Sequence, residues 1–316
     1  MKESDEFLIL QKFFKRLGSR YNDSSGVLIG PGDDAGLFFA KNSELVFSTD
    51  VSNEAIHFPR KLAPNLIAYR ACAVAASDIA ASGASLKWLS ISLVTSTKRI
   101  DWLKKFVEGI RLFTKTYQVP VIGGDLVKGK ECSISVGVCG EVQRGLFLSR
   151  KGAQIGDSIY ISGKLGLAKL GLELSTSKKT KLSTIEKTSL IKFLKPKVHI
   201  ELGINLRKIA NSCIDISDGL IGDLNHICKD SGVGAELDKD LIPYAGSFEE
   251  ALTWGDDYEL CFTVPVNKEK KLFDLSKKTK TKLFKIGRIV NGENVKIFEN
   301  KEEIFLNKNS YNHFSK

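Results

Sequence analysis

Apolar residues recur with two different spacings in the first half of the chain. Alternation at every second residue, or a short apolar run, predicts strands at residues 45–50, 88–94, 119–122 and 132–142. Spacings of three and four predict helices at residues 7–17, from about Pro64 past Asp78, and at residues 101–117. Strands and helices therefore alternate, as they do in an α/β or α+β fold.

The second half of the chain repeats this alternation. Strands are predicted at residues 158–163, 212–217, 258–264 and 283–290, and helices at residues 167–174, after Gly219 and at residues 268–280. The polar and basic segment 175–188 is predicted to be a mobile surface loop. A length of 316 residues exceeds the usual span of one hydrophobic core. We therefore expect two domains, at residues 1–147 and 148–316.

Composition narrows the class of protein. A hydrophobic fraction of 42% and a charged fraction of 27% are typical of a folded globular chain. The first residues are acidic where a secretory signal is basic, and no uncharged apolar run reaches the roughly 18 residues of a membrane helix. The six cysteines form no CxxC pair and have apolar neighbours, which favours buried reduced thiols. We therefore expect a soluble cytoplasmic protein with no membrane partner.

The net charge of +10 is the one feature that favours nucleic-acid binding. However, the lysines gather in runs such as residues 178–181 and 268–271 without interleaved aromatic residues, which indicates solvated faces. We therefore expect no nucleic-acid partner. A basic nucleic-acid-binding protein stays the alternative from another functional class, and a steep salt dependence of binding to DNA or RNA would support it.

Five segments place a carboxylate beside small residues. The first is Gly30-Pro31-Gly32-Asp33-Asp34-Ala35-Gly36, and the others contain Ser48-Thr49-Asp50, Ser77-Asp78, Gly123-Gly124-Asp125 and Asp215-Ile216-Ser217-Asp218-Gly219. Each alone has a simpler explanation, because Asp33, Asp34 and Asp50 suit turns and Asp218 suits a helix N-cap. Their joint occurrence in a basic chain instead indicates a shared use. Mg²⁺ is usually held by a few carboxylates together with substrate phosphates, so the segments predict a site for metal and phosphate.

The common nucleotide-binding motifs do not explain this pattern. The sequence contains neither GxxxxGK[ST] nor a GxGxxG that follows a strand. Asp215 and Asp218 flank a predicted strand-to-helix junction and could reach one ion, and a helix N-terminus also binds phosphate well. His57 follows Asp50 closely, although a lone histidine beside Phe58 is usually a packing residue. Metal-assisted phosphoryl transfer without a P-loop is the chemistry that this set favours.

The order and spacing of these segments resemble the thiamine-monophosphate kinase family, within the superfamily of aminoimidazole ribonucleotide synthetase. The resemblance also includes Glu54-Ala55-Ile56-His57-Phe58, Gly255-Asp256-Asp257-Tyr258-Glu259-Leu260 and Tyr311-Asn312-His313-Phe314, so it covers nearly the whole chain. It implies ATP-dependent phosphorylation of thiamine monophosphate to thiamine diphosphate. It also implies a homodimer of two-domain subunits, in which the N-terminal domains pair through their sheets, the C-terminal domain is α/β and the nucleotide lies between domains.

The resemblance further implies three sets of site residues. The residues expected to bind Mg²⁺ are Asp33, Ser48, Thr49, Asp50, Asp78, Asp125, Asp215 and Asp218. The residues expected to contact ATP are Gly123, Gly124, Asp125, Leu126, Arg150 and Ser217. The residues expected to contact thiamine monophosphate are His57, Asp256 and Tyr311. Asp256 is one methylene shorter than the family's usual Glu, and Leu126 can offer only its backbone where Thr is usual.

Other ATP-using enzymes of the superfamily are the nearest alternatives. Selenophosphate synthesis would favour a reactive cysteine before the first acidic motif, whereas the first cysteine is Cys72. The hydrogenase maturation protein would favour a C-terminal cysteine, whereas the sequence closes with His313-Phe314-Ser315-Lys316. An ATP-dependent enzyme of the superfamily with a different substrate remains the alternative to the kinase.

Overall fold

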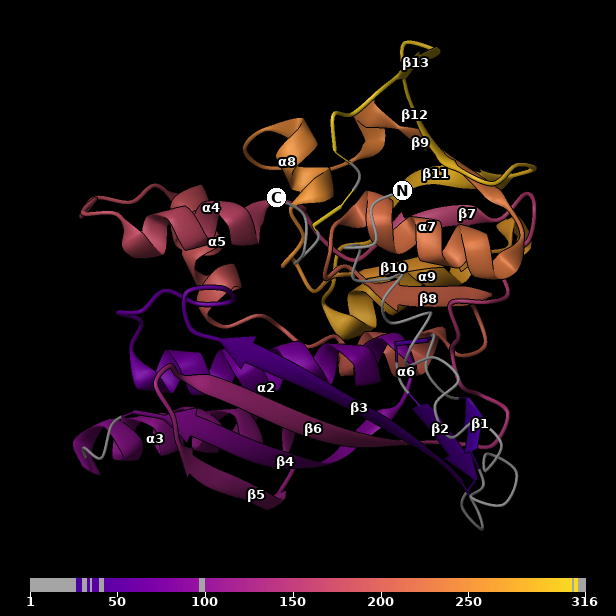
Figure 1. The fold of residues 1–316 in the computed structure, drawn as a ribbon. Coiled ribbons are helices and arrows are strands. Elements are labelled where there is room, and N and C mark those ends of the chain that lie inside the picture. Colours follow the sequence, from indigo (N-terminus) through magenta and orange to yellow (C-terminus); the bar gives the residue numbers. More distant parts are fainter. Residues whose placement is uncertain are drawn as a thin grey trace, which may run out of the picture.

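The computed structural model describes residues 27–29, 33–34, 36–39, 43–96, 100–308 and 310–311. Two sheets form two layers of the molecule, and a long helix, α2 (Pro64–Ala81), lies between them (Figure 1). The helix predicted at residues 7–17 lies outside the described residues. Among the described residues, no helix has both the length and the hydropathy needed to cross a membrane.

The first sheet has six strands in the order β1-β2-β3-β6-β4-β5. Their bounds are β1 Val27–Ile29, β2 Gly36–Phe39, β3 Glu44–Asn53, β4 Ser85–Thr95, β5 Val121–Lys128 and β6 Ser133–Val142. Only β4 and β5 run parallel, and the other neighbours are antiparallel. Helices α2 and α3 (Ile100–Tyr117) lie behind the sheet in Figure 1, and no described helix or strand covers its other face.

Helix α2 is buried on nearly all sides because its side chains are small. It begins with Pro64 in the first turn, and its alanines are buried from Ala68 to Ala81. Small side chains allow α2 to pack against the first sheet on one side and, on the other, to share one core with Phe262 and Leu260 of the second sheet. This placement brings Asp78, near the end of α2, to the boundary between the two sheets.

The second sheet has seven strands in the order β13-β12-β9-β11-β7-β10-β8. Their bounds are β7 Ser158–Ile161, β8 Ser212–Asp215, β9 Gly234–Asp238, β10 Leu260–Val264, β11 Phe284–Val290, β12 Val295–Glu299 and β13 Glu302–Ile304. Its helices are α4 Leu167–Thr176, α5 Thr184–Leu194, α6 Ile200–Leu206, α7 Leu220–Ser231, α8 Phe248–Thr253 and α9 Lys270–Thr279. Apolar residues of α7 and α8 complete the core on one face of this sheet, and α2 and α9 cover part of the other.

The structure corrects three details of the sequence prediction. Half of segment 175–188 is helical, because α4 extends to Thr176 and α5 begins at Thr184; only residues 177–183 connect the two helices as a loop. Ser183 caps α5 and shares a capping box with Glu186, a local signal that the polar composition concealed. Strand β5 continues through Gly123-Gly124-Asp125 instead of ending before it, and β3 continues beyond Asp50. The two sheets are separated by residues 143–157, and the domain boundary at residue 147 stays a prediction.

Candidate active site

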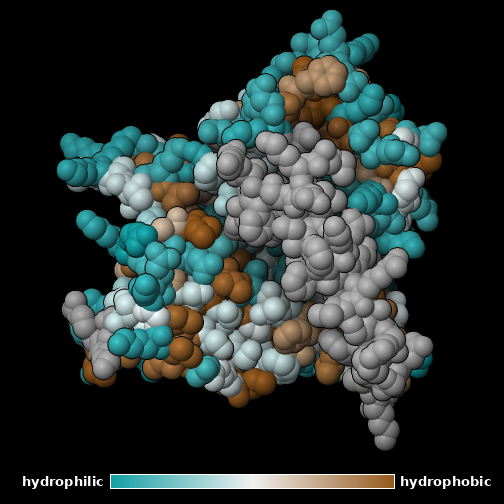
Figure 2. All heavy atoms as spheres, in the orientation of Figure 1, coloured by the Kyte–Doolittle hydropathy of each residue, from teal (hydrophilic) through white to brown (hydrophobic). Residues whose placement is uncertain are grey.

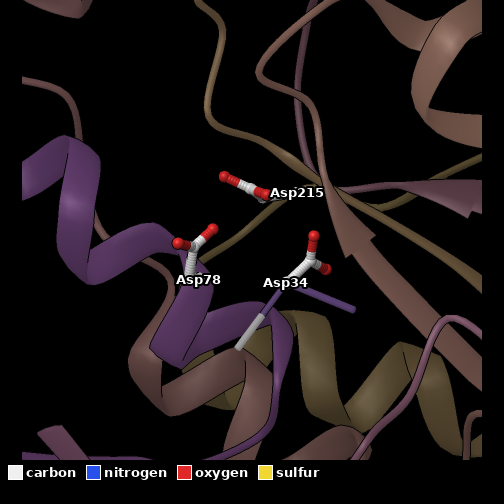
Figure 3. Close-up of side chains that lie close together, drawn as sticks. All are labelled: Asp34, Asp78 and Asp215. Atoms are coloured by element: carbon white, nitrogen blue, oxygen red, sulfur yellow. The ribbon is translucent and has the colours of Figure 1, made fainter. Parts of the chain in front are cut away.

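Three carboxylates from distant parts of the sequence converge at the boundary between the sheets. Asp34 precedes β2, Asp78 lies on α2 and Asp215 ends β8. Each offers an oxygen within 4.8 Å of the others, and Figure 3 shows the three groups turned toward one space. Oxygen donors alone, held by both layers of the molecule, form a ligand set suited to a hard divalent cation.

Three further predicted metal ligands border this trio. Asp50 and Ser48 lie on the face of β3 that packs toward α2, and the Ser48 hydroxyl donates to a carboxylate oxygen of Asp78. Thr49 points to the opposite, exposed face because successive side chains of a strand alternate. Asp218 follows Asp215 in the turn before α7 and raises the pKa of Asp50. The structure therefore brings Ser48, Asp50 and Asp218 to the trio and places the side chain of Thr49 elsewhere.

The pKa values show that nearby positive charge does not offset the burial and mutual repulsion of these carboxylates. Burial, and then repulsion by neighbouring carboxylates, raises the pKa of Asp50 to about 6 and that of Asp78 well above its ordinary value. Burial is also the main cause that raises the pKa of Asp215 to about 6 and that of Asp34 to about 7, although Arg150 opposes both shifts. Buried like charges of this kind need a cation to be stable when ionised, so the residues fit Mg²⁺.

The adjacent residues Asp33 and Asp34 have different hydrogen-bond partners. The Asp34 carboxylate belongs to the trio and accepts from Nε of Arg150 at 2.8 Å. Asp33 accepts from the Ser149 hydroxyl at 2.6 Å. The family motif predicts metal binding by Asp33 and not by Asp34, although both acids belong to the same doublet. The role of Asp33 stays a prediction, and Asp34 is a candidate ligand that the motif did not indicate.

The Gly123-Gly124-Asp125 motif lies far from the trio within one chain. It is on β5, an edge strand whose residues are all exposed. Asp125 pairs with Ser92 of β4, which pairs with Ser135 of β6, which pairs with Val51 of β3. Three strand spacings of about 4.8 Å separate Asp125 from β3 by roughly 14 Å. Within one subunit, this motif and Asp50 do not lie within reach of one ion.

A pocket of about 450 Å³ opens beside the acidic residues. It contains two predicted metal ligands, Asp50 and Asp218, one predicted ATP contact, Ser217, and the three predicted substrate residues, His57, Asp256 and Tyr311. The structure therefore brings together three groups of residues that the sequence assigned to three different ligands. Nδ1 of His57 accepts from the backbone N–H of Asn53 at 3.0 Å, which leaves the proton of a neutral ring on Nε2.

Several residues in or near the pocket received no role from the sequence. Trp254 and Tyr258 line the pocket with Tyr311, and the ring centroids of Trp254 and Tyr311 are 6.4 Å apart. Asp256 accepts a hydrogen bond from the buried Arg70 of α2. Asp223, buried in α7, accepts from the backbone N–H of Asp218 at 3.1 Å and so orders the turn that carries Asp218. A single aromatic residue, arginine or aspartate outside a recognisable motif does not indicate a functional site from sequence alone.

Comparison with known proteins matches both halves of the chain. The family model of the AIR synthase related protein N-terminal domain matches residues 32–142, and that of the C-terminal domain matches residues 154–300. The thiamine-monophosphate kinase of Buchnera aphidicola subsp. Schizaphis graminum is 38% identical over 326 residues, with 99% of each chain covered. That of Escherichia coli K12 is 38% identical, with 82% of each chain covered. The chain belongs to the thiamine-monophosphate kinase family.

Solved structures of this family agree with the fold. AaThiL complexed with AMPPCP and TMP superposes with a TM-score of 0.86 at 30% identity, covering 99% of this chain and 98% of that chain. Thiamine-monophosphate kinase from Stenotrophomonas maltophilia K279a gives a TM-score of 0.77 at 33% identity, covering 92% and 96%. The family and the two-domain α/β fold predicted from the motifs are therefore confirmed.

The acidic site should make the stability of this family member depend on pH in an unusual direction. Asp34, Asp50 and Asp215 titrate near pH 6 to 7 in the folded protein, and such groups titrate at about 3.9 when unfolded. From the unfolded value to about one pH unit above the folded values, the folded chain binds more protons than the unfolded chain, so the free energy of unfolding falls as pH rises. We expect the metal-free protein to unfold at a higher temperature at about pH 6.5 than at about pH 8.

Thermal unfolding in buffers with a chelator measures this trend. Burial also lowers the pKa of His226 to about 4. Below the ordinary pKa of 6.5, this shift makes the free energy of unfolding rise with pH, so the comparison is made above about pH 6.5, where His226 has little effect. Adding Mg²⁺ should reverse the trend, because the cation binds the ionised carboxylates. Metal-free stability that rises with pH across this window would contradict the assignment of a charged, uncompensated site.

Proposed function

We propose that this protein transfers the γ-phosphoryl group of ATP to thiamine monophosphate and so forms thiamine diphosphate. The observation that carries the proposal is the pocket of about 450 Å³ that joins the acidic residues to His57, Asp256 and Tyr311. Its aromatic side chains suit the flat rings of a thiamine, of which the thiazolium is cationic, and the carboxylates at its edge suit metal-bound phosphates. The similar protein AaThiL was solved with AMPPCP and TMP together.

The chain's own residues act by binding and positioning. The acceptor is a phosphate monoester with a second pKa of about 6, so it is largely ionised near neutral pH and needs no general base. Bound Mg²⁺ supplies neutralisation of the phosphate charges. Arg150, held by Asp34 beside the trio, adds positive charge where two anions must approach. The aromatic walls of the pocket hold the thiamine end and fix the direction of the acceptor phosphate.

The residue assignments follow the family motifs, and the geometry adds Asp34. We assign Mg²⁺ to Asp33, Asp34, Ser48, Thr49, Asp50, Asp78, Asp125, Asp215 and Asp218. We assign ATP to Gly123, Gly124, Asp125, Leu126, Arg150 and Ser217, and thiamine monophosphate to His57, Asp256 and Tyr311. The cytoplasmic location and the absence of a nucleic-acid partner stay predictions from the sequence.

We also propose a homodimer that pairs through the first sheet. The open face of this sheet exposes apolar side chains of β3, such as Phe47 at 38% and Val51 at 46%, and β5 exposes Ile122 and Leu126 at 59% each. Figure 2 shows hydrophobic residues gathered over the lower half of the molecule, where this sheet lies in Figure 1. A second copy that covers this face would also bring its own β5 and Asp125 near the site. This arrangement would give the Gly123-Gly124-Asp125 motif a role that it lacks within one chain.

Formation of thiamine diphosphate from thiamine monophosphate, ATP and Mg²⁺ is the direct test. Wild-type protein should form the product, and Asp50→Asn should lose it because one carboxylate of the metal site is gone. Asp274→Asn, which alters an exposed carboxylate on α9, is the matched control and should keep wild-type activity. A folded wild type that binds ATP but forms no thiamine diphosphate would leave the family membership standing and refute the substrate.

A further inference from the structure

A buried arginine from the N-terminal half forms part of the wall behind the substrate pocket. Arg70 of α2 is 3% exposed. One guanidinium nitrogen donates to the Asp256 carboxylate, and another donates to the backbone carbonyl of Phe193 at 2.6 Å. The guanidinium also lies 4.4 Å from the ring centroid of Phe193 and 5.9 Å from that of Tyr258. Three of its partners, Phe193, Asp256 and Tyr258, line the pocket.

The turn that carries Asp256 has an unfavourable backbone. Asp256 and Tyr258 have φ values of 67° and 49°, in the left-handed region that side chains with a Cβ disfavour. On one side the turn is held by backbone hydrogen bonds, from Asp256 N–H to Ser217 and from Tyr258 N–H to Ile216, both at 2.8 Å. On the other side, the Arg70 guanidinium holds it through the Asp256 carboxylate. A strained turn persists only where its surroundings determine it in this way.

The ion pair between Arg70 and Asp256 also keeps a negative charge at the pocket wall, where it could attract a cation. The Asp256 side chain is 22% exposed and that of Arg70 only 4%, so the carboxylate reaches the pocket while the guanidinium stays behind it. Burial raises the pKa of Asp256, and Arg70 opposes this shift and stabilises the ionised form. Without Arg70, the buried Asp256 carboxylate would keep its hydrogen bond with Tyr258 but lose its counter-charge, which is costly. Asp256 therefore depends on a residue of the other half of the chain.

We propose that Arg70 is a positioning residue for the thiamine substrate, which fixes the Asp256 carboxylate and the turn at residues 255–258 in the form that lines the pocket. The identity of the substrate rests on the function proposed above, whereas the role of Arg70 in ordering the turn is independent of that function. Because Arg70 comes from α2 and its partners come from α5 and the turn before β10, substrate binding is sensitive to the relative placement of the two halves.

Steady-state kinetics of Arg70→Met tests this proposal. We expect the KM for thiamine monophosphate to rise at least about tenfold, since removal of one partner of a buried charge pair is costly, while the KM for ATP changes less than about threefold. Arg70→Lys keeps the charge and should recover part of the loss. Arg288→Met, which breaks the exposed pair with Glu236, is the matched control and should leave both constants unchanged. Equal increases in both KM values, or no increase, would overturn the proposal.

A double variant separates the pair from simple loss of folding. Asp256→Asn removes the charge that Arg70→Met leaves unpaired, so the double variant should bind thiamine monophosphate no worse than Arg70→Met alone. The two single effects on KM should therefore be strongly non-additive. Additive effects would show that the two residues act independently, which would refute the proposal.

Hydrogen exchange gives a readout that needs no substrate. In Arg70→Met, the N–H groups of Asp256 and Tyr258 should exchange faster than in wild type, whereas that of Ile289, bonded to Asp157 at 2.8 Å in the same sheet layer, should not. If this occurs in a protein that forms no thiamine diphosphate, the positioning role stands and the proposed function fails. If the wild type is active and exchange at residues 256 and 258 is unchanged, the positioning role fails.

Discussion

Asp78→Asn should abolish phosphoryl transfer and also make the metal-free protein more stable. Asp78 lies within 4.8 Å of two other carboxylates through its oxygens, and burial followed by their repulsion raises its pKa well above the ordinary value. Asparagine has nearly the same shape and can still accept from Ser48, so repulsion is removed without a cavity. Turnover should fall about a thousandfold or more, because a metal ligand is lost at the centre of charge neutralisation.

Two measurements on the same variant test these opposite effects. Formation of thiamine diphosphate measures turnover, and thermal unfolding with and without Mg²⁺ measures stability. Wild type should gain about 2.7 kcal/mol when Mg²⁺ is a hundredfold above its dissociation constant, and Asp78→Asn should lose most of this gain. A variant that keeps the full Mg²⁺ effect, or that is less stable than wild type in chelator, would contradict the assignment. Asp274→Asn again serves as the control, because its carboxylate is exposed.

The sequence could predict much of the site because its ligands lie in segments with recognisable local chemistry. Asp50 follows a short apolar run, Asp78 follows a run of small residues and Asp215 closes a buried strand. These aspartates lie at or near the ends of helices and strands, so their occurrence together in the sequence is enough to predict a shared site. The family followed from the same segments, the fold class agrees with the spacing of apolar residues, and both are confirmed.

The residues that the sequence could not reveal depend on side-chain direction and on distant packing. Asp33 and Asp34 are adjacent acids, and only the backbone path decides that Asp34 faces Asp78 while Asp33 faces Ser149. Arg70 lies in an alanine-rich helix, where a charge has no visible partner until α5 and the turn before β10 pack against it. Local patterns fix elements, whereas such contacts arise from the arrangement of the whole chain.

Asp125 belongs to a clear sequence motif, but the structure places it away from the other predicted metal ligands of its own chain. It lies on the exposed edge strand β5, three strand spacings from β3. If the proposed dimer is right, each site takes Asp50 from one chain and Asp125 from its partner. A dimer of Asp50→Asn with Asp125→Asn would then hold one site with both defects and one site with none.

Such mixed dimers should recover activity that neither variant has alone. Co-expression of the two variants with different affinity tags allows doubly tagged dimers to be purified, and these should show about half the wild-type activity. Mixed dimers of Asp50→Asn with Asp78→Asn are the matched control and should stay inactive, because both residues belong to the site of their own chain and each site keeps one defect. Inactive dimers of Asp50→Asn with Asp125→Asn would mean that Asp125 does not act across the dimer. Because Asp125 is too far from Asp50 within one chain, it can complete the site only from a second subunit. The activity of the mixed dimers therefore decides whether each active site is formed by one subunit or by two.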